Sequence, residues 1–229
     1  MRHLAVIMDG NRRWARKNQF SLAAGYSEGG KRALQEVMQF CLEKGILYLS
    51  LYTFSLENFY RSQEEKEIVF SMLLKEVYAQ QEMLLKEEIS IRFVGKLELL
   101  PPDVLKACRE LEEVTHNGTR LNVALLICYG GQQEVIAAIK KIVSDGSITS
   151  DSSEQQIQEQ FEKALWNYPF PVPDLIIRTG AVKRLSNFLP YQSVYSELVF
   201  LDILWPEITK KDCQYAYDIF QATQRNFGR

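Results

Sequence analysis

Strand-length apolar stretches alternate with helical patterns along the whole chain, and this alternation restricts the fold more than any other feature. Six stretches have the length and apolar character of strands, at residues 4–8, 46–54, 89–94, 121–128, 175–177 and 198–201. Apolar residues at helical spacing fill the segments between and after them, at residues 27–44, 62–88, 101–117, 132–143, 157–165 and 209–227. This order is typical of a parallel sheet flanked by helices. We predict one α/β domain over residues 1–229, with a central, mostly parallel six-stranded sheet.

The predicted helix at residues 62–88 carries an unusually wide apolar face. Ser62 and Glu65 have the spacing of a capping box at its start. The apolar positions are Ile68, Val69, Met72, Leu73, Val77 and Leu84. Such a face either packs into the core or forms the wall of an elongated cavity for a hydrocarbon chain, and the pattern alone leaves both interpretations open.

Composition excludes several functional classes. Lys and Arg total 27 and Asp and Glu total 29, so the net charge of −2 argues against a protein that binds nucleic acid through bulk charge. The 4 cysteines contain no C-x-x-C pair, which predicts inert thiols and neither a zinc site nor a disulfide framework. A charge appears too early for a secretory leader, and no stretch has the ~20 apolar residues of a membrane span. We expect a soluble cytoplasmic protein.

Unusual polar residues follow the predicted strands, where ligands of open α/β sheets bind. The first strand is followed by Asp9 and Gly10, the fifth by Thr179 and Gly180. The basic residues at these strand ends are Arg12, Arg13, Arg61, Arg178, Lys183 and Arg184. The alternative for the first of them is a solvated helix face of Arg12, Arg13, Arg16 and Lys17. Concentrated arginines in a chain of near-zero net charge favour a site for polyanions such as diphosphates.

Asp9 is the one carboxylate that directly follows the first strand among these basic residues. It either holds Mg²⁺ together with phosphate oxygens or caps a helix at residues 11–17, and spacing does not separate the two. His3 and His116 are expected to be structural or exposed, because their placement suggests neither a triad nor a zinc site. Neither the P-loop pattern nor G-x-G-x-x-G occurs, so nucleotide binding through those loops is not supported.

Several segments together carry a family resemblance. They are residues 3–15 (HLAVIMDGNRRWA), 51–61 (LYTFSLENFYR), 174–180 (DLIIRTG), 184–189 (RLSNFL), 195–198 (YSEL) and 204–206 (LWP). In this order, and over nearly the whole chain, they resemble the signatures of the cis-prenyltransferases, the undecaprenyl diphosphate synthase family. The chain is identified as a member on these motifs.

The resemblance implies an activity. Such enzymes condense isopentenyl diphosphate repeatedly onto an allylic starter, usually farnesyl diphosphate, and form each new double bond in the cis configuration. It implies Mg²⁺ as cofactor, a homodimer, no nucleic-acid partner, and a hydrophobic tunnel for the product between helices and sheet. The implied product is undecaprenyl diphosphate, a lipid carrier for cell-wall glycans, whose delivery would involve transient membrane contact.

The resemblance also implies roles for individual residues. Asp9 is the catalytic, metal-linked carboxylate, and Glu197 is a second carboxylate assigned to the metal. The implied allylic diphosphate site comprises Gly10, Asn11, Arg12, Arg13 and Trp14. The implied isopentenyl diphosphate site comprises Arg178, Arg184, Leu185 and Ser186. A mobile, substrate-binding segment comprises Ser55, Leu56, Glu57, Asn58, Phe59 and Arg61, in which Asn58 is implied to be a catalytic residue that helps to remove the proton. Because an amide is not basic near neutral pH, we expect Asn58 to orient a diphosphate oxygen or a water that accepts the proton.

The chain departs from the family pattern at several positions. Leu22 and Tyr26 stand where an Arg and a His are common, which concerns contacts to the allylic diphosphate. The family's C-terminal Arg-x-Gly motif has Asn226 at its Arg position, and Arg225 stands one place before it. In relatives this Arg makes a contact that reaches across the dimer. At four other positions the chain has a residue different from the family's usual one: Phe59 for Trp, Cys128 for Asn, Val182 for Glu and Pro190 for an apolar residue.

Two other functions compete with an elongating enzyme. The first is a non-catalytic partner subunit of the same fold, which could lose its metal carboxylate without penalty, so the retained Asp9 argues against it. The second is a Mg²⁺-dependent phosphatase with Asp9 as nucleophile. That chemistry usually has a second carboxylate two residues later, where this chain has Asn11.

Overall fold

A six-stranded sheet forms the centre of the computed structural model, which describes residues 1–224. Its strands are β1 (His3–Ile7), β2 (Tyr48–Ser55), β3 (Ile89–Val94), β4 (Leu121–Tyr129), β5 (Leu175–Arg178) and β6 (Glu197–Phe200). They lie in the order β3-β4-β2-β1-β5-β6, and every neighbouring pair is parallel. The predicted α/β architecture is confirmed, and β1 lies inside the sheet between β2 and β5.

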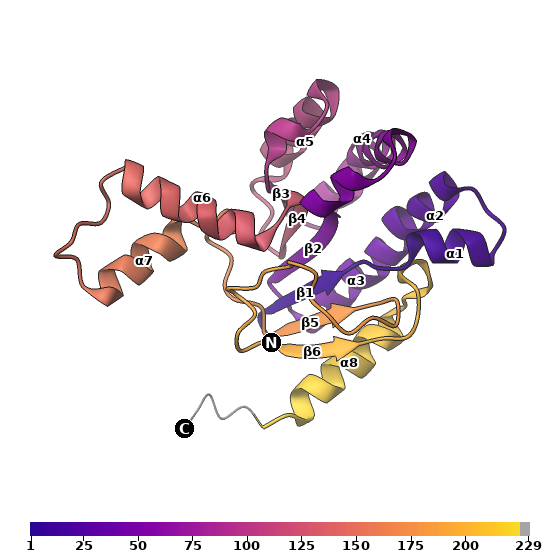
Figure 1. Ribbon diagram of the computed structural model, residues 1–229. Coiled ribbons are helices and arrows are strands. Elements are labelled where there is room, and N and C mark those ends of the chain that lie inside the picture. Colours follow the sequence, from indigo (N-terminus) through magenta and orange to yellow (C-terminus); the bar gives the residue numbers. More distant parts are fainter. Residues whose placement is uncertain (225–229) are drawn as a thin grey trace.

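Helices connect the first five strands as the sequence predicts, whereas a loop connects β5 to β6. The α-helices are α1 (Asn11–Lys17), α2 (Leu22–Glu28), α3 (Leu34–Lys44), α4 (Gln63–Lys86), α5 (Pro102–Thr115), α6 (Gly131–Ser144), α7 (Glu154–Ala164) and α8 (Lys210–Ala222). Shorter turns are the π-helical η1 (Gly29–Ala33) and the 3₁₀ segments η2 (Leu56–Tyr60), η3 (Leu97–Leu99) and η4 (Trp205–Glu207). In Figure 1, α6 and α7 extend away from the sheet.

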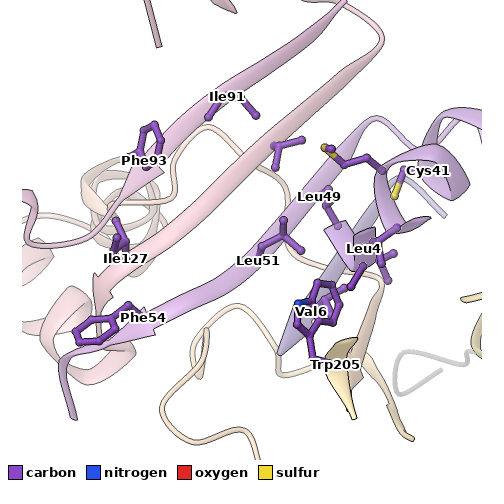
Figure 2. Packing of buried hydrophobic residues seen from close by; sticks show 14 of the residues in the cluster. Leu4, Val6, Cys41, Leu49, Leu51, Phe54, Ile91, Phe93, Ile127 and Trp205 are labelled. Carbon is purple, nitrogen blue, oxygen red and sulfur yellow. The ribbon is translucent and has the colours of Figure 1, made fainter. Parts of the chain in front are cut away.

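The two faces of the sheet bury different partners. Leu4 and Val6 of β1 belong to the main core, where they lie near Trp205 (Figure 2). That core takes its helical members chiefly from α3, α4, α5 and α8. Ala5 and Ile7, which point to the opposite face, belong to a smaller cluster with Phe188. Residues off the sheet in that cluster come from connecting loops, so the carboxyl end of β5 is packed against loop structure.

The helical pattern predicted at residues 27–44 differs most from the structure. The helix starts earlier, at Leu22, where the Ser21 Oγ accepts a hydrogen bond from the Ala24 N–H at 3.2 Å. It then widens into η1 before α3. A Cβ atom at Gly29 would lie 2.2 Å from Asn11 Oδ1, so the glycine allows η1 to approach α1 closely.

Smaller boundaries also shift. Strand β6 begins and ends one residue before the predicted span of 198–201. The last helix ends at Ala222, and the predicted end at Phe227 lies outside the described residues, as do Arg225 and Asn226.

Other composition-based expectations are confirmed. The cysteines Cys41, Cys108, Cys128 and Cys213 are free and buried. His3 is buried and bonds the Pro171 carbonyl and the Ser50 hydroxyl, while His116 is exposed. Within residues 1–224, no helix combines the length and apolar character needed to cross a bilayer.

Candidate active site

Asp9 lies directly beyond the carboxyl end of β1, between two arginines. Its Oδ1 accepts a hydrogen bond from Arg13 Nη2 at 2.9 Å, and its Oδ2 accepts one from Arg178 Nη2 at 3.0 Å. The N-cap of α1 is Gly10, without any side-chain hydrogen bond, so the interpretation of Asp9 as a helix cap is wrong. Gly10 has φ of 126°, and a Cβ there would lie 2.9 Å from Leu204 Cα, so this turn requires glycine.

Arg178 ends β5 and organises the loop that follows it. Its side chain is only 5% exposed. Nη1 donates to Ser186 Oγ at 2.8 Å and also to the Arg184 carbonyl. Its Nε, although buried, has no hydrogen-bond partner. Arg178 therefore joins Asp9 to the loop at residues 184–187 and keeps one donor unused.

The segment after β2 is fixed by a reciprocal cap. Asn58 Oδ1 accepts a hydrogen bond from the Ser55 N–H at 3.2 Å, and the Ser55 side chain caps the turn in return. While Oδ1 holds this cap, the N–H groups of Asn58 remain available to a substrate. This agrees with an orienting role for Asn58 and argues against a role as a base.

A buried carboxylate that the sequence did not single out as a site residue holds the other side of the site. Glu65, 6% exposed, accepts hydrogen bonds from Tyr26 Oη at 2.8 Å and from Arg61 Nη1 at 2.9 Å. Arg12 forms a longer ion pair with it at 3.5 Å. Burial raises the pKa of Tyr26 to about 12, so its hydroxyl stays protonated and donates. The four-residue spacing of Arg61, which precedes α4, and Glu65, in the first turn of α4, could have indicated the pair.

These elements surround a cavity of about 850 Å³. The predicted site residues that line it are Asp9, Gly10, Asn11, Arg12, Arg13, Ser55, Glu57, Asn58, Arg61, Arg178, Arg184 and Ser186. Arg16, Tyr26 and Asn187 also line it. Positive charge exceeds negative charge along this wall, which suits a polyanion.

Four predicted substrate-binding residues do not line this cavity. Trp14 packs against Phe20 with ring centroids 5.6 Å apart, and Phe59 packs edge-on against Phe54 at 5.3 Å. Leu56 and Leu185 are partly buried against the main core and the smaller cluster, respectively. Their side chains support the walls of the site.

Glu197 lies far from Asp9 along the sheet. It begins β6 and pairs with Leu175, whereas Asp9 follows the opposite, carboxyl end of β1. Among residues 1–224 no three His, Cys, Asp or Glu side chains gather as a metal site. Asp9 is the carboxylate that lies within hydrogen-bond distance of Arg178 in this chamber.

A second, apolar cavity of about 100 Å³ continues from the polar one. The two cavities share Met8, Asn11, Tyr26 and Thr53 in their linings. Helix α4 contributes Val69, Met72, Leu73, Val77 and Leu84 to the apolar wall. The wide face of this helix thus packs into the core with four of these residues and also lines a cavity.

The wall of the apolar cavity carries a short polar strip. Gln80, 8% exposed, donates to Glu76 Oε2 at 3.0 Å and accepts from Gln35 Nε2 at 3.4 Å. Gln80 and Glu76 both line the cavity. The apolar lining is therefore interrupted on α4.

A chamber rich in arginine that shares its lining with an apolar pocket, at the carboxyl edge of a parallel sheet, suits an enzyme whose substrates combine an anionic group with an apolar chain. The family model described as putative undecaprenyl diphosphate synthase matches residues 7–228. The chain belongs to this family, and it is a cis-prenyltransferase of the isoprenyl transferase type.

Individual relatives agree with this assignment. An isoprenyl transferase of Thermotoga maritima is 38% identical over 226 residues, which cover 99% of this chain and 96% of that protein. A tritrans,polycis-undecaprenyl-diphosphate synthase (geranylgeranyl-diphosphate specific) of Thermococcus kodakarensis is 40% identical over 100% of this chain and 87% of its own length.

Two solved structures have the same fold. Lavandulyl diphosphate synthase from Lavandula x intermedia, in complex with dimethylallyl diphosphate, superposes with a TM-score of 0.93 at 26% identity, covering 100% of this chain and 98% of that one. A probable undecaprenyl diphosphate synthase from Campylobacter jejuni gives 0.83 at 31% identity, covering 100% and 99%.

Proposed function

We propose that this enzyme condenses isopentenyl diphosphate repeatedly onto farnesyl diphosphate and releases a long cis-polyprenyl diphosphate of undecaprenyl length. The observation that carries the proposal is the position of Asp9, between Arg13 and Arg178, in a polar chamber continuous with an apolar one. Relatives named as geranylgeranyl-diphosphate specific make that longer starter the alternative.

The proposed roles divide the chamber between two diphosphates. Arg178, Arg184 and Ser186, already joined to one another, bind the diphosphate of isopentenyl diphosphate. Asn11, Arg12 and Arg13, with Gly10 at the turn, face the allylic diphosphate. Before a substrate arrives, the carboxylate of Asp9 keeps two guanidinium groups oriented toward the chamber, which lowers the cost of ordering them.

The residues fit Mg²⁺ bound by one carboxylate. Mg²⁺ commonly takes one or two protein carboxylates and fills its other positions with water and phosphate oxygens. The Asp9 side chain is 30% exposed and lines the cavity, so it can supply that carboxylate. When bound, the ion would neutralise charge on the leaving diphosphate and so favour cleavage of the allylic C–O bond.

The remaining proposed steps concern the alkene and the proton. The double bond of isopentenyl diphosphate attacks the allylic carbon, and loss of a proton forms the new cis alkene. Asn58 orients a diphosphate oxygen or a water that accepts this proton, through its free N–H groups. Closure of the segment 55–61 over the chamber keeps water away from the allylic cation.

Product length depends on the apolar cavity. Its volume of about 100 Å³ is much smaller than a C55 chain, so a long product requires α3 and α4 to separate as the chain grows. A long apolar product would also bring the enzyme into transient contact with a membrane at release.

We also propose a homodimer. Helix α6 exposes an apolar stripe at Ile136 (53%), Ile139 (48%) and Val143 (64%), three residues on one face. A metal role for Glu197 would require a second copy of the chain, because Glu197 and Asp9 lie at opposite ends of one sheet. Sedimentation of the wild-type enzyme and of Ile139→Lys measures the association: the proposal expects a dimer that this variant weakens.

The competing functions receive less support. A non-catalytic subunit would have no need to keep Asp9 and its two arginine partners. For the phosphatase, Asn11 would have to act in place of the second carboxylate, yet its buried Oδ1 has no partner and faces Gly29.

A product assay tests the proposed function. Purified protein is incubated with farnesyl or geranylgeranyl diphosphate, radiolabelled isopentenyl diphosphate and Mg²⁺, and the extracted products are separated by length. We expect a ladder ending at one length, absent with EDTA and in Asp9→Ala, but retained in Asp151→Asn, which changes an exposed carboxylate before α7. A folded wild-type dimer without extractable product would overturn the proposal.

A further inference from the structure

Asn187 connects two walls of the polar chamber. Its Nδ2 donates to Glu57 Oε1 in η2 at 2.7 Å and to Gln133 Oε1 in α6 at 3.1 Å. Its Oδ1 accepts from the Gln132 N–H at 2.9 Å, and its carbonyl accepts from the Gly131 N–H at 2.8 Å. One side chain therefore links η2, the start of α6 and the loop that carries Ser186.

The backbone at Gly130 and Gly131 is shaped around this residue. A Cβ at Gly131 would lie 2.0 Å from Pro190 Cδ and 3.0 Å from the Asn187 carbonyl oxygen. A Cβ at Gly130 would lie 3.0 Å from Asn187 Nδ2. Glycine at both positions lets the loop at 186–190 approach the first turn of α6, which brings Asn187 within reach of Glu57.

The same loop is strained, and its neighbours hold it. Ser186 has φ of 52°, Asn187 of 66° and Leu189 of 46°, a region in which non-glycine residues cost about 1 kcal/mol or more each. Phe188 stacks on Tyr52 with ring centroids 4.8 Å apart, and the Tyr52 hydroxyl donates to the Ser186 carbonyl at 3.3 Å. Strain of this kind persists where the surroundings determine the conformation, as at functional sites.

We propose that Asn187 is a positioning residue that fixes η2 to the loop of Arg184 and Ser186, so that the two sides of the chamber move as one. The inference rests on the proposed function, in which that loop binds isopentenyl diphosphate and η2 carries Asn58. It assigns Asn187 a second effect as well. By donating to Glu57, it holds a carboxylate at the rim, away from the incoming diphosphates.

The contact between Asn187 and Glu57 can be tested by exchanging which of the two side chains donates the hydrogen bond and which accepts it. In Asn187→Asp the new carboxylate still accepts from the Gln132 N–H, but it loses the donor and repels Glu57. In Glu57→Gln the amide oxygen still accepts from Asn187. In the double variant E57Q/N187D, Gln at 57 donates to Asp at 187, and the net charge equals that of the wild type.

We expect Asn187→Asp to raise KM for isopentenyl diphosphate at least tenfold and to change KM for the allylic substrate little, with kcat also reduced. Glu57→Gln alone supplies the single-variant reference that the double-mutant cycle requires. The double variant should recover most of the loss. Because a purely structural asparagine would show no dependence on residue 57, the rescue distinguishes positioning from loop stability.

Three results would overturn the proposal: wild-type kinetics in Asn187→Asp, a double variant no better than Asn187→Asp, or an increase in KM for the allylic substrate alone. If Asn187→Asp does not fold, Asn187→Gly keeps the positive φ and removes the side chain, and wild-type KM for isopentenyl diphosphate in that variant would equally contradict it. An inactive wild-type enzyme would instead reject the proposed function itself.

Discussion

Arg178 Nη2 lies 3.0 Å from Asp9 Oδ2, and the two residues are 169 positions apart in sequence. Strands β1 and β5 are neighbours with Ile7 paired to Arg178, so their carboxyl ends place the two side chains together. Arginine keeps its proton at any accessible pH, and its planar fork reaches Asp9, Ser186 and the Arg184 carbonyl at once. The pair therefore joins the two proposed diphosphate sites.

The geometry of this fork gives the first prediction. Arg178→Lys keeps the charge, but a single ammonium group cannot reach all three partners. We expect kcat/KM for isopentenyl diphosphate to fall about 10- to 100-fold, roughly 1.4–2.7 kcal/mol of transition-state stabilisation. The matched control is Arg109→Lys, which alters an exposed arginine paired with Glu112 and should leave kinetics unchanged. Equal kinetics for Arg178→Lys and wild type would show that charge alone suffices.

The second prediction concerns stability at mildly acid pH. Burial lowers the pKa of His3 from 6.5 to about 4. Its Nδ1 lies 2.6 Å from the Pro171 carbonyl, which can only accept, so the neutral ring donates there and accepts from Ser50 through Nε2. The folded state thus favours neutral His3, whereas the unfolded chain protonates near pH 6.5.

The sign of the effect follows from that difference. The contribution of His3 is complete above pH 6.5 and is lost as the pH falls toward 4, by roughly 3 kcal/mol in total. Urea unfolding of the wild type and of His3→Gln between pH 4 and 7 measures this, and the variant should show a shallower decline. Parallel curves for the two proteins would contradict the assignment.

Product length should respond to the polar strip on α4. Replacing Gln80 by Leu removes an amide from the wall and extends the apolar lining toward Leu84. We expect the product distribution to shift toward longer chains. Gln81→Leu, which changes the next residue outside the cavity lining, is the control. A shift of the same size in both variants would mean that the strip does not influence elongation.

A fourth prediction concerns the close approach at η1. In Gly29→Ala the added methyl would meet Asn11 Oδ1 at 2.2 Å and Trp205 Cδ1 at 2.7 Å. Overpacking of this kind costs about 1–3 kcal/mol. We expect a lower urea midpoint and a raised KM for the allylic substrate, since Asn11 lines the chamber. The exposed Gly146→Ala, with open space around its Cβ position, should leave that KM unchanged although its φ of 63° costs stability.

Local patterns predict the sheet well, because each strand is a short apolar run and every connection except the one between β5 and β6 has helical spacing. The same local patterns do not predict the start of the helix before η1. This helix begins at Leu22, but Gly25, Gly29 and Gly30 make the segment resemble a loop in sequence. Glycines are poor helix formers. The close packing that requires glycine at Gly25 and Gly29 comes from α1 and η4, which no local window contains.

Some residues of the candidate site could likewise be predicted from the sequence, and others could not. Asp9, Arg178 and Ser186 could be predicted, since residues after parallel strands meet at one edge. Asn187 could not be assigned a role, because its partner Glu57 is distant in sequence. For Glu65 only the pairing with Arg61 is local, and the contact with Tyr26 is not. Glu197 shows the opposite case, in which a matching motif lies at the other end of the sheet from the carboxylate it was paired with.

The placement of β1 inside the sheet has a consequence for synthesis. The first strand leaves the ribosome with one of its two eventual neighbours, β5, still about 170 residues from being made. The edge of β1 that pairs with β5 stays unpaired until β5 has been synthesised. Pairing of two strands so far apart in sequence is entropically costly and slow. The chamber can therefore form only after nearly the whole polypeptide exists, so a prematurely ended chain should contribute no activity and should instead be prone to aggregation.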